Sequence, residues 1–463
     1  MHIFNKTILR AYDIRGVFNK TLFCKDAQFI AKSFAKYLND NNYSGNIAVG
    51  YDGRTSSISL KDSLVNGLVE SGINVKLINL CPTPVLYYAI NHLKCDAGIM
   101  ITGSHNPKDH NGFKIALHDR PFYGDDIIRL SKIAASSEFI DKIGSYSYYN
   151  IIDSYINRII RDLDFNNDRK LKIAWDCGNG ATGEVIKKMI SKLKHDSILL
   201  YSDIDGNFPN HHPDPSDVNN MKDLQQAVLD SKCDLGIAFD GDGDRIGVVD
   251  DKGKIIWGDD LMILYSKDLL RKNPGCKIIA DVKASNLLFN KIAEFGGKPI
   301  MYKTGHSFIK SKMKQEKALL AGEMSGHIFF ADKYYGYDDA IYCAIRLINI
   351  IINSSKSLSE IRSEIPIKFS TNEIRINCDD NQKFLIIEKI KNYLNNNNIT
   401  YNDIDGIRYD DGDGWWLLRA SNTQAALVLR CEANNSINLS KIKNSLLSIM
   451  DKFSVKIDKS LLL

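Results

Sequence analysis

Residues 235–245 read LGIAFDGDGDR, a short apolar run that ends in an aspartate and opens into a polar, glycine-rich loop. The pattern recurs in IAVGYDGR (47–54), KIAWDCGNG (172–180) and KIIADVKAS (277–285), and each segment has the composition of a buried strand entering a turn. Helical patterns lie between these segments, at 26–38, 60–70, 184–193 and 259–270. Because strands alternate with helices, the sequence predicts α/β domains with sites at the carboxyl ends of the strands.

The chain has 463 residues, enough for about three domains of about 150 residues each. Asp52, Asp176 and Asp281 occupy similar points of the strand–helix cycle, 124 and 105 residues apart. This spacing suggests one α/β unit used three times, although convergent strand-turn chemistry would give the same pattern. After residue 366, a helical pattern at 381–395 lies between strand-like segments, which predicts a smaller α+β domain.

The composition excludes several classes of protein. A net charge of +4, from 60 basic and 56 acidic residues, is too small to indicate a nucleic-acid partner. The nine cysteines form no C-x-x-C pair, which argues against a disulfide framework or a zinc site and favours reduced thiols. The N-terminus lacks the apolar core of a signal peptide, and Arg346 and Asn349 interrupt the most apolar segment, 340–352. We expect a cytoplasmic protein that binds neither nucleic acid nor membranes.

DGDGDR places Asp240, Asp242 and Asp244 at every second position with glycine between them. Three carboxylates supply hard oxygen ligands, which suit Mg²⁺ or another hard divalent cation. An EF-hand does not fit, because its sixth position is Arg245, its twelfth is Asp251, and the flanking segments are strand-like. A solvated acidic turn is the alternative.

TGSHNPKDHNGFK (102–114) forms a second constellation, with Ser104 in a loop after the apolar run AGIMI. Asn-Pro and Asn-Gly pairs predict a tight loop that holds Ser104 forward. No G-x-S-x-G motif is present, so the sequence gives little support to an acyl-transfer triad. Lys114 begins the next apolar stretch, from which its side chain can point back at the loop.

Three further loops carry side chains that suit polar ligands. RASNT (419–423) groups a guanidinium with hydroxyl and amide donors, which suits a phosphate. GEMSGH (322–327) sets a carboxylate and a hydroxyl two residues apart, which suits sugar hydroxyls, and KTGHS (303–307) presents a histidine in a glycine turn. Taken singly, each loop is equally well explained as an ordinary polar turn.

Five motifs occur in a fixed order: AYDIRG (11–16), TGSHNP (102–107), DGDGDR (240–245), GEMSGH (322–327) and RASNT (419–423). With this set, the chain resembles the α-D-phosphohexomutase superfamily, and most of all its bacterial phosphomannomutase/phosphoglucomutase branch. The resemblance extends from Tyr12 to about Arg430. It implies three similar α/β domains with mixed sheets and a smaller, hinged C-terminal α+β domain, arranged around a central cleft. We place these domains at 1–150, 151–254, 255–366 and 367–463.

The resemblance also implies roles for individual residues. Ser104 would carry a phosphoryl group as phosphoserine, and one of its oxygens would join Asp240, Asp242 and Asp244 in binding Mg²⁺. Glu323 and Ser325 would recognise sugar hydroxyls. The phosphate that is not transferred would be bound by Arg419, Ser421, Asn422 and Thr423. Other active-site positions of the family correspond to Tyr12, Arg15, Arg245, Lys283, His306 and His327.

The implied reaction interconverts hexose 1-phosphates and hexose 6-phosphates through a hexose 1,6-bisphosphate, which would also act as an activator. Because the 3- and 4-hydroxyls are common to glucose and mannose, we expect both sugars to be substrates. Phosphoryl transfer requires cations near the serine, for which Arg15, Lys114 and Arg245 are candidates. The proton carrier is either Lys114 or His327.

Three alternatives stay open at this point: a phosphoglucosamine mutase, a Mg²⁺-dependent sugar phosphatase, and a silent sugar-phosphate-binding protein. The presence of Ser104 and of all three aspartates argues against the last. We expect a monomer.

Overall fold

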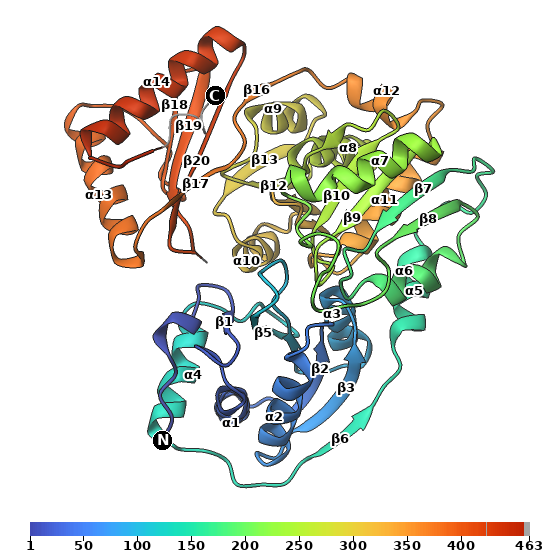
Figure 1. The fold of residues 1–463 in the computed structure, drawn as a ribbon, viewed down its shortest axis with the longest axis vertical. Coiled ribbons are helices and arrows are strands. Elements are labelled where there is room, and N and C mark those ends of the chain that lie inside the picture. Colours follow the sequence, from blue (N-terminus) through green and yellow to red (C-terminus); the bar gives the residue numbers. More distant parts are fainter. Residues whose placement is uncertain (423, 458–463) are drawn as a thin grey trace.

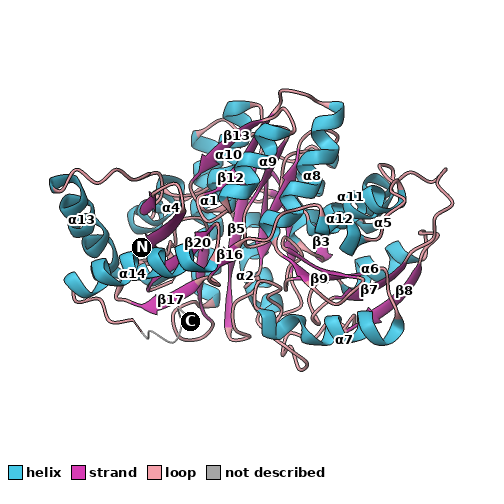
Figure 2. Ribbon diagram, turned by 90° about the horizontal axis from the view of Figure 1, so that it is seen from above, coloured by secondary structure: helices cyan, strands magenta, loops and turns pink. Residues whose placement is uncertain are grey.

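The computed structural model describes residues 1–422 and 424–457, which form four domains (Figure 1). In Figure 1 the first domain lies at the bottom, the second and third lie above it, and the fourth lies at the upper left. Figure 2 shows α13 and α14 of the last domain at one end of the molecule and α7 and β8 of the second at the other. The predicted fold class, α/β domains followed by a smaller α+β domain, is confirmed.

The first domain has a six-stranded mixed sheet in the order β1-β5-β4-β2-β3-β6. Its strands are β1 (Ile14–Val17), β2 (Asn46–Tyr51), β3 (Asn74–Leu80), β4 (Ala97–Ile101), β5 (His110–Leu117) and β6 (Ser145–Tyr148). Its helices are η1 (Lys6–Ile8), α1 (Cys24–Asp40), α2 (Ser57–Val69), α3 (Thr83–His92) and α4 (Asp125–Ser136). Buried apolar side chains on one face of α1 pack on α2 and α4, as the amphipathic pattern requires.

The second domain has five strands in the order β11-β10-β9-β7-β8. They are β7 (Lys172–Asp176), β8 (Asp196–Leu200), β9 (Leu235–Phe239), β10 (Ile246–Asp250) and β11 (Ile255–Ile256). The helices are α5 (Ile152–Ile160), α6 (Gly183–Ile190), η2 (Val218–Met221) and α7 (Lys222–Ser231). LGIAF forms β9, which is fully buried, and DGDGDR forms the loop that leads into β10.

The third domain has four strands in the order β13-β12-β14-β15. They are β12 (Lys277–Asp281), β13 (Lys298–Tyr302), β14 (Leu320–Gly322) and β15 (Ile328–Phe330). The helices are α8 (Gly258–Lys272), α9 (Asn286–Glu294), α10 (His306–Glu316), α11 (Ala340–Ile352) and α12 (Leu358–Ser363). The apolar segment 340–352 is α11, and all of its residues except Asn349 and Ile350 are buried. No helix in the described part of the chain is long and apolar enough to cross a membrane.

The fourth domain is antiparallel throughout. Its strands are β16 (Phe369–Ser370), β17 (Ile374–Asn377), β18 (Ile407–Asp410), β19 (Gly414–Ala420) and β20 (Ala426–Ala433). Its helices are α13 (Asp380–Asn396) and α14 (Ser436–Lys452). The sheet order is β16-β20-β19-β18, and β17 also pairs with β20.

The first three sheets contain one repeated unit, as the spacing of the strand-ending aspartates suggested. The order β5-β4-β2-β3 in the first sheet corresponds to β10-β9-β7-β8 in the second and to β15-β14-β12-β13 in the third. In each unit the two central strands are parallel, and the outer hairpin is antiparallel. Asp52, Asp176 and Asp281 lie at the carboxyl ends of the equivalent strands β2, β7 and β12. The hairpin loops of the three units therefore occupy equivalent positions.

Candidate active site

A cavity of about 760 Å³ lies between the four domains. Three of the loops that line it are the equivalent hairpin loops: β4–β5 carries Ser104, β9–β10 carries Arg245, and β14–β15 carries Glu323. The fourth domain contributes Arg419 from the end of β19. The repeated sheet unit thus brings three different chemical groups to one space, because strand ends of α/β units carry the loops that form sites.

Ser104 is 2% exposed and has a left-handed backbone with φ of 50°. Its Oγ donates to Asp240 Oδ2 at 3.0 Å and lies 3.1 Å from His105 Nδ1. Its backbone N–H donates to Thr102 Oγ1 at 2.7 Å. The serine hydroxyl is therefore held between a carboxylate of the second domain and an imidazole of its own loop.

Asp240, Asp242 and Asp244 are fully buried, and their carboxylate oxygens lie within 4.8 Å of one another. Burial, together with the charges of Asp244 and Asp242, raises the pKa of Asp240 well above its ordinary value. Asp242 Oδ1 is buried without a hydrogen-bond partner among the described residues. Closely spaced, buried carboxylates with an unshared oxygen have the chemistry of a hard-cation site, so this cluster fits a divalent metal ion.

Lys114 lies on β5 and is buried beside this cluster. Its Nζ donates to Asp242 Oδ2 at 2.7 Å and also to Asp244 Oδ2. Burial lowers the pKa of Lys114, but the carboxylates of Asp242 and Asp244 outweigh burial and raise it above its ordinary value. The contacts of this side chain are with the aspartate loop of the second domain, to which it brings a positive charge.

His327 links the cluster of three aspartates to the loop that carries Glu323. Its Nε2 lies 3.2 Å from Asp244 Oδ1, and its Nδ1 lies 3.0 Å from Glu323 Oε2. Burial lowers the pKa of His327, but Asp244 and Glu323 raise it to about 9. Ser325 Oγ lies 3.3 Å from Nδ1, so both predicted sugar-reading residues, Glu323 and Ser325, contact this imidazole.

His306 and Tyr12 form the adjoining wall. The ring of His306 stacks on His327 with centroids 5.7 Å apart, and Tyr12 meets His306 edge to face at 5.8 Å. Burial lowers the pKa of His306 well below its ordinary value, which favours the neutral ring. The Tyr12 hydroxyl donates to Thr304 O at 2.8 Å and accepts from Asn422 Nδ2. One side chain of the first domain thus touches the third and fourth domains.

The RASNT loop leaves β19 and faces the cavity. Arg419 Nε donates to Asp405 Oδ2 at 3.0 Å, whereas Arg419 Nη2 is buried without a hydrogen-bond partner among the described residues. Ser421 and Asn422 also line the cavity, and Thr423 lies outside the described residues. A buried guanidinium with a free donor is suited to an anionic group such as a phosphate.

The remaining predicted residues also line the cavity. Arg15 donates to Asn106 Oδ1 at 3.1 Å and pairs with Asp13. Arg245 Nη2 lies 3.3 Å from the Nε2 atom of His105. Lys283 Nζ lies 3.0 Å from Glu373 Oε2, which belongs to the fourth domain. All predicted residues in the described part of the chain line the cavity, except the three aspartates, which are reached through Ser104 and Lys114.

Several residues of the site were not predicted from the sequence. His105 stands in the TGSHNP motif, but a histidine beside a serine is too common to indicate a role. Asp338 is fully buried and lies 2.9 Å from Lys310 Nζ and 3.6 Å from His306 Nδ1. Arg54 closes the quoted segment IAVGYDGR, yet only the structure reveals its contacts with the serine loop.

The loops that carry Ser104, the three aspartates and Glu323 occupy equivalent places in three repeated sheets. This is the fold of the α-D-phosphohexomutases, which are isomerases. The phosphoglucomutase/phosphomannomutase family models match residues 6–140 for α/β/α domain I, 153–253 for domain II, 257–369 for domain III and 373–448 for the C-terminal domain. The chain belongs to the phosphoglucomutase/phosphomannomutase family.

Individual relatives agree with this assignment. A Pseudomonas syringae pv. tomato protein named phosphomannomutase/phosphoglucomutase is 43% identical over 98% of this chain and 97% of its own length. A Neisseria gonorrhoeae protein named phosphoglucomutase is 40% identical over 96% of this chain and 97% of its own length. The crystal structure of a phosphoglucomutase/phosphomannomutase family protein from Burkholderia thailandensis is 36% identical, has a TM-score of 0.91, and covers 98% of this chain and 99% of its own.

Proposed function

We propose that this chain interconverts hexose 1-phosphates and hexose 6-phosphates, with Ser104 as the phosphoryl carrier. The observation that carries the proposal is the 3.0 Å contact between Ser104 Oγ and Asp240 Oδ2 in a cavity lined by four domains. The free hydroxyl of a hexose phosphate attacks the phosphorus of phosphoserine, and the bond from phosphorus to Ser104 Oγ breaks. The attacking hydroxyl loses its proton, and Ser104 Oγ gains one, so that the serine hydroxyl is restored. The resulting 1,6-bisphosphate turns in the cleft and returns its other phosphate to Ser104 Oγ.

Asp240, Asp242 and Asp244 would hold Mg²⁺, which supplies a positive charge for the phosphoryl oxygens when bound. Lys114 orients two of these carboxylates through its hydrogen bonds to Asp242 and Asp244. Arg15 and Arg245 add guanidinium groups to the cavity wall, where the transferring phosphoryl charge has to be stabilised.

His327 is the stronger of the two candidates for the proton carrier. Each candidate contacts two carboxylates: Lys114 contacts Asp242 and Asp244, and His327 contacts Asp244 and Glu323. The pKa of Lys114 is raised above its already high ordinary value, whereas that of His327 is raised only to about 9, so His327 gives up a proton more readily. The His327 ring lies on the cavity wall between Asp244 and Glu323, where an imidazole can exchange a proton with a sugar hydroxyl. We therefore assign proton transfer to His327 and charge stabilisation to Lys114.

Substrate recognition divides between two loops. Glu323 and Ser325 would bind the 3- and 4-hydroxyls, and Arg419, Ser421, Asn422 and Thr423 would bind the phosphate that is not transferred. Tyr12, Lys283 and His306 would complete the binding site. Because the proposed contacts do not discriminate at carbon 2, glucose and mannose phosphates would both be accepted.

The proposal extends to the surroundings of the reaction. A hexose 1,6-bisphosphate would activate the enzyme by phosphorylating Ser104. We also propose a cytoplasmic monomer without nucleic-acid or membrane partners, and domains bounded at 1–150, 151–254, 255–366 and 367–463.

A coupled assay tests the function with glucose, mannose and glucosamine 1-phosphates, each with and without Mg²⁺ and trace 1,6-bisphosphate. We expect turnover of the glucose and mannose phosphates, and a gain of one phosphate on Ser104 by mass spectrometry. Ser104→Ala should lose most turnover, whereas Ser33→Ala, which alters another buried serine of the same domain, should not. Turnover that survives Ser104→Ala would refute the mechanism, and release of inorganic phosphate would indicate a phosphatase. A preference above about a thousandfold for one sugar would exclude dual specificity.

A further inference from the structure

Arg54 lies just after β2, and its residue surface is 2% exposed. Its guanidinium donates four hydrogen bonds to backbone carbonyls of the loop that carries Ser104. Nη2 donates to Ser104 O at 2.7 Å and Asn106 O at 2.6 Å, and Nη1 donates to Pro107 O at 2.6 Å and His110 O at 2.9 Å. One side chain therefore gathers the carbonyls of the whole serine loop around a single planar group.

This arrangement depends on the shape of a guanidinium as well as on its charge. A guanidinium presents donors in a rigid, planar fork, whereas an ammonium is a compact charge on a flexible stem. Ser104 has a left-handed backbone, which non-glycine residues keep only where their surroundings enforce it. The hydrogen bond from Arg54 to the carbonyl of Ser104 is such a constraint.

The carboxylate of Asp52 anchors both the arginine and the loop. Asp52 Oδ2 lies 3.2 Å from Arg54 Nε and accepts from Gly103 N at 3.1 Å, and Oδ1 accepts from Arg54 N at 3.0 Å. In the third domain the equivalent strand-ending aspartate, Asp281, accepts from Met324 N at 3.3 Å in the corresponding hairpin loop. The first and third units thus use their strand-ending carboxylate to hold a hairpin loop, and the first unit adds Arg54 to that support.

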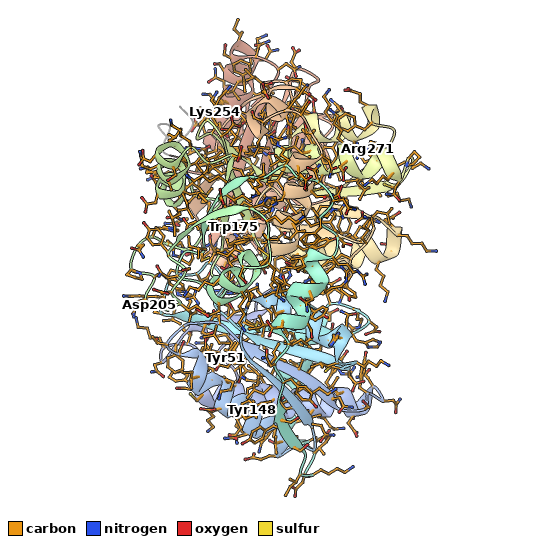
Figure 3. The ribbon with its side chains drawn as sticks, turned by 90° about the vertical axis from the view of Figure 1, so that its right-hand side faces the viewer. Tyr51, Tyr148, Trp175, Asp205, Lys254 and Arg271 are labelled. Atoms are coloured by element: carbon orange, nitrogen blue, oxygen red, sulfur yellow. The ribbon has the colours of Figure 1, made fainter. Side chains whose placement is uncertain are left out.

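The second domain closes over the same arginine. The Phe208 ring centroid lies 5.1 Å from the Arg54 guanidinium carbon, within the range of a cation–π contact. A Cβ added at Gly206 would lie 2.6 Å from Arg54 Cα, so the two backbones pack closely. Figure 3 shows Asp205, from this same segment, beside the strands of the first domain. The segment 204–208 therefore clamps Arg54 between the two domains that supply the serine and the three aspartates.

We propose that Arg54 is a positioning residue for the phosphoryl transfer. It fixes the Ser104 loop against the aspartate cluster, and Phe208 holds Arg54 in place. The proposal rests on the function proposed above, because it concerns the same serine. A displacement of about 1 Å at a reacting atom can reduce a rate about a hundredfold, so the geometry enforced by Arg54 should appear in kcat.

Arg54→Lys tests this proposal because it keeps the positive charge and removes the planar fork. We expect kcat to fall about a hundredfold while KM for the hexose phosphate stays unchanged. We also expect slower phosphorylation of Ser104 by added 1,6-bisphosphate, followed by mass spectrometry after rapid quenching. The matched control is Arg120→Lys, because Arg120 also hydrogen-bonds within the first domain, to Asp126 and Tyr37, but not to the serine loop. This control should have the same kcat as the chain without substitutions.

The outcomes separate the two proposals. If Ser104 of the chain without substitutions is not phosphorylated by added 1,6-bisphosphate, the proposed function fails. If it is, and Arg54→Lys keeps the same kcat and phosphorylation rate, the role of Arg54 is overturned. An equal loss of kcat in Arg120→Lys would also overturn it, because the effect would then be general destabilisation. If Arg54→Lys does not fold, Phe208→Leu decides: slower Ser104 phosphorylation supports the positioning role, and an unchanged rate overturns it.

Discussion

The first three domains are joined to one another differently from the fourth. One hydrophobic cluster, which includes Met100, Trp175 and Ile345, runs through the first three domains, and the first domain also has a cluster of its own that includes Phe34. Figure 3 labels Trp175. The fourth domain has a separate core, built around residues such as Leu429, between its sheet and its two helices. A small cluster, Val282, Trp415 and Leu417, is the apolar part of its contact with the third domain.

The junction with the fourth domain is otherwise polar. Arg408 and Arg430 lie over the ring of Trp415, 3.7 and 5.6 Å from its centroid. Arg408 Nη1 donates to Ala284 O at 2.9 Å, and Ser285 Oγ donates to Glu432 Oε1 at 2.7 Å. Water can replace such hydrogen bonds at a small net cost, whereas exposing a shared apolar core is costly. The proposed reacting groups stand on the first three domains, here called the fixed body, and the proposed phosphate clamp, the RASNT loop, stands on the fourth. We predict that the fourth domain moves relative to the fixed body.

The largest test of this difference is Asp242→Asn, on the fixed body. Replacing one carboxylate weakens the metal-type site, and loss of several kcal/mol of charge stabilisation corresponds to about a thousandfold in kcat. Steady-state kinetics at saturating hexose phosphate and Mg²⁺ measures the effect. Asp250→Asn, another buried carboxylate of the second domain, should leave kcat unchanged. A change in KM alone for Asp242→Asn would contradict the assignment of the reacting groups to the first three domains.

Next in size is a pair of core substitutions, Ile345→Ala and Leu429→Ala, both at fully buried positions. Each should reduce the free energy of unfolding by about 3 kcal/mol, because a buried aliphatic side chain is lost and a cavity is left. Hydrogen exchange during denaturation should show that Ile345→Ala weakens the first three domains together. Leu429→Ala should weaken only the fourth domain. If either variant destabilises all four domains equally, the two cores are not independent.

A smaller effect is expected from Arg419→Lys in the clamp. The ammonium keeps the charge but not the fork, so binding weakens in the ground state and the transition state alike. We expect KM to rise about tenfold with little change in kcat, measured with glucose 1-phosphate. Arg271→Lys alters an exposed arginine, labelled in Figure 3, and should change neither constant. A fall in kcat at constant KM would place Arg419 among the reacting groups instead.

The smallest effect is expected at His211, which supports the fixed body. Burial lowers its pKa, but the bond between His211 Nε2 and Asp176 Oδ2, 2.9 Å long, outweighs burial and raises it. A raised pKa stabilises the folded protein fully below about pH 6.5, and this contribution is lost as the pH rises through the folded-state pKa.

His211→Gln should therefore lower the unfolding free energy by about 1 kcal/mol at pH 6 and by less at pH 9, as measured by urea denaturation. His212→Gln, at the exposed neighbouring position, should show no such pH dependence. An equal difference at both pH values would contradict the ionic role of His211.

The local features of the fold could be predicted from the sequence, and the junctions between domains could not. The patterns at 26–38 and 259–270 correspond to α1 and α8, and the four strand–loop segments correspond to β2, β7, β9 and β12. Apolar periodicity indicates which residues are buried but not what they pack against. Nothing in the sequence therefore distinguished the shared core of the first three domains from the separate core of the fourth.

The residues of the candidate active site, too, could be predicted only in part from the sequence. The three aspartates could be recognised because their chemistry lies within five consecutive residues. Arg54 acts on a serine 50 residues away, through backbone carbonyls that have no signature in the sequence. Residues that react are thus easier to find from sequence than residues that hold them.

The contact between Asn422 and Tyr12 joins the fourth domain to the first at the wall of the cavity. A hydrogen bond with a net free energy of about 1 kcal/mol changes a two-state equilibrium about fivefold. In the proposed reaction, the clamp releases one phosphate, and the 1,6-bisphosphate must turn end over end before it leaves the cleft. This contact between two side chains would then help to set how often the bisphosphate turns and how often it escapes from the cleft. Each escape leaves Ser104 without its phosphate. The contact would therefore influence how many turnovers the enzyme completes before Ser104 has to be phosphorylated again.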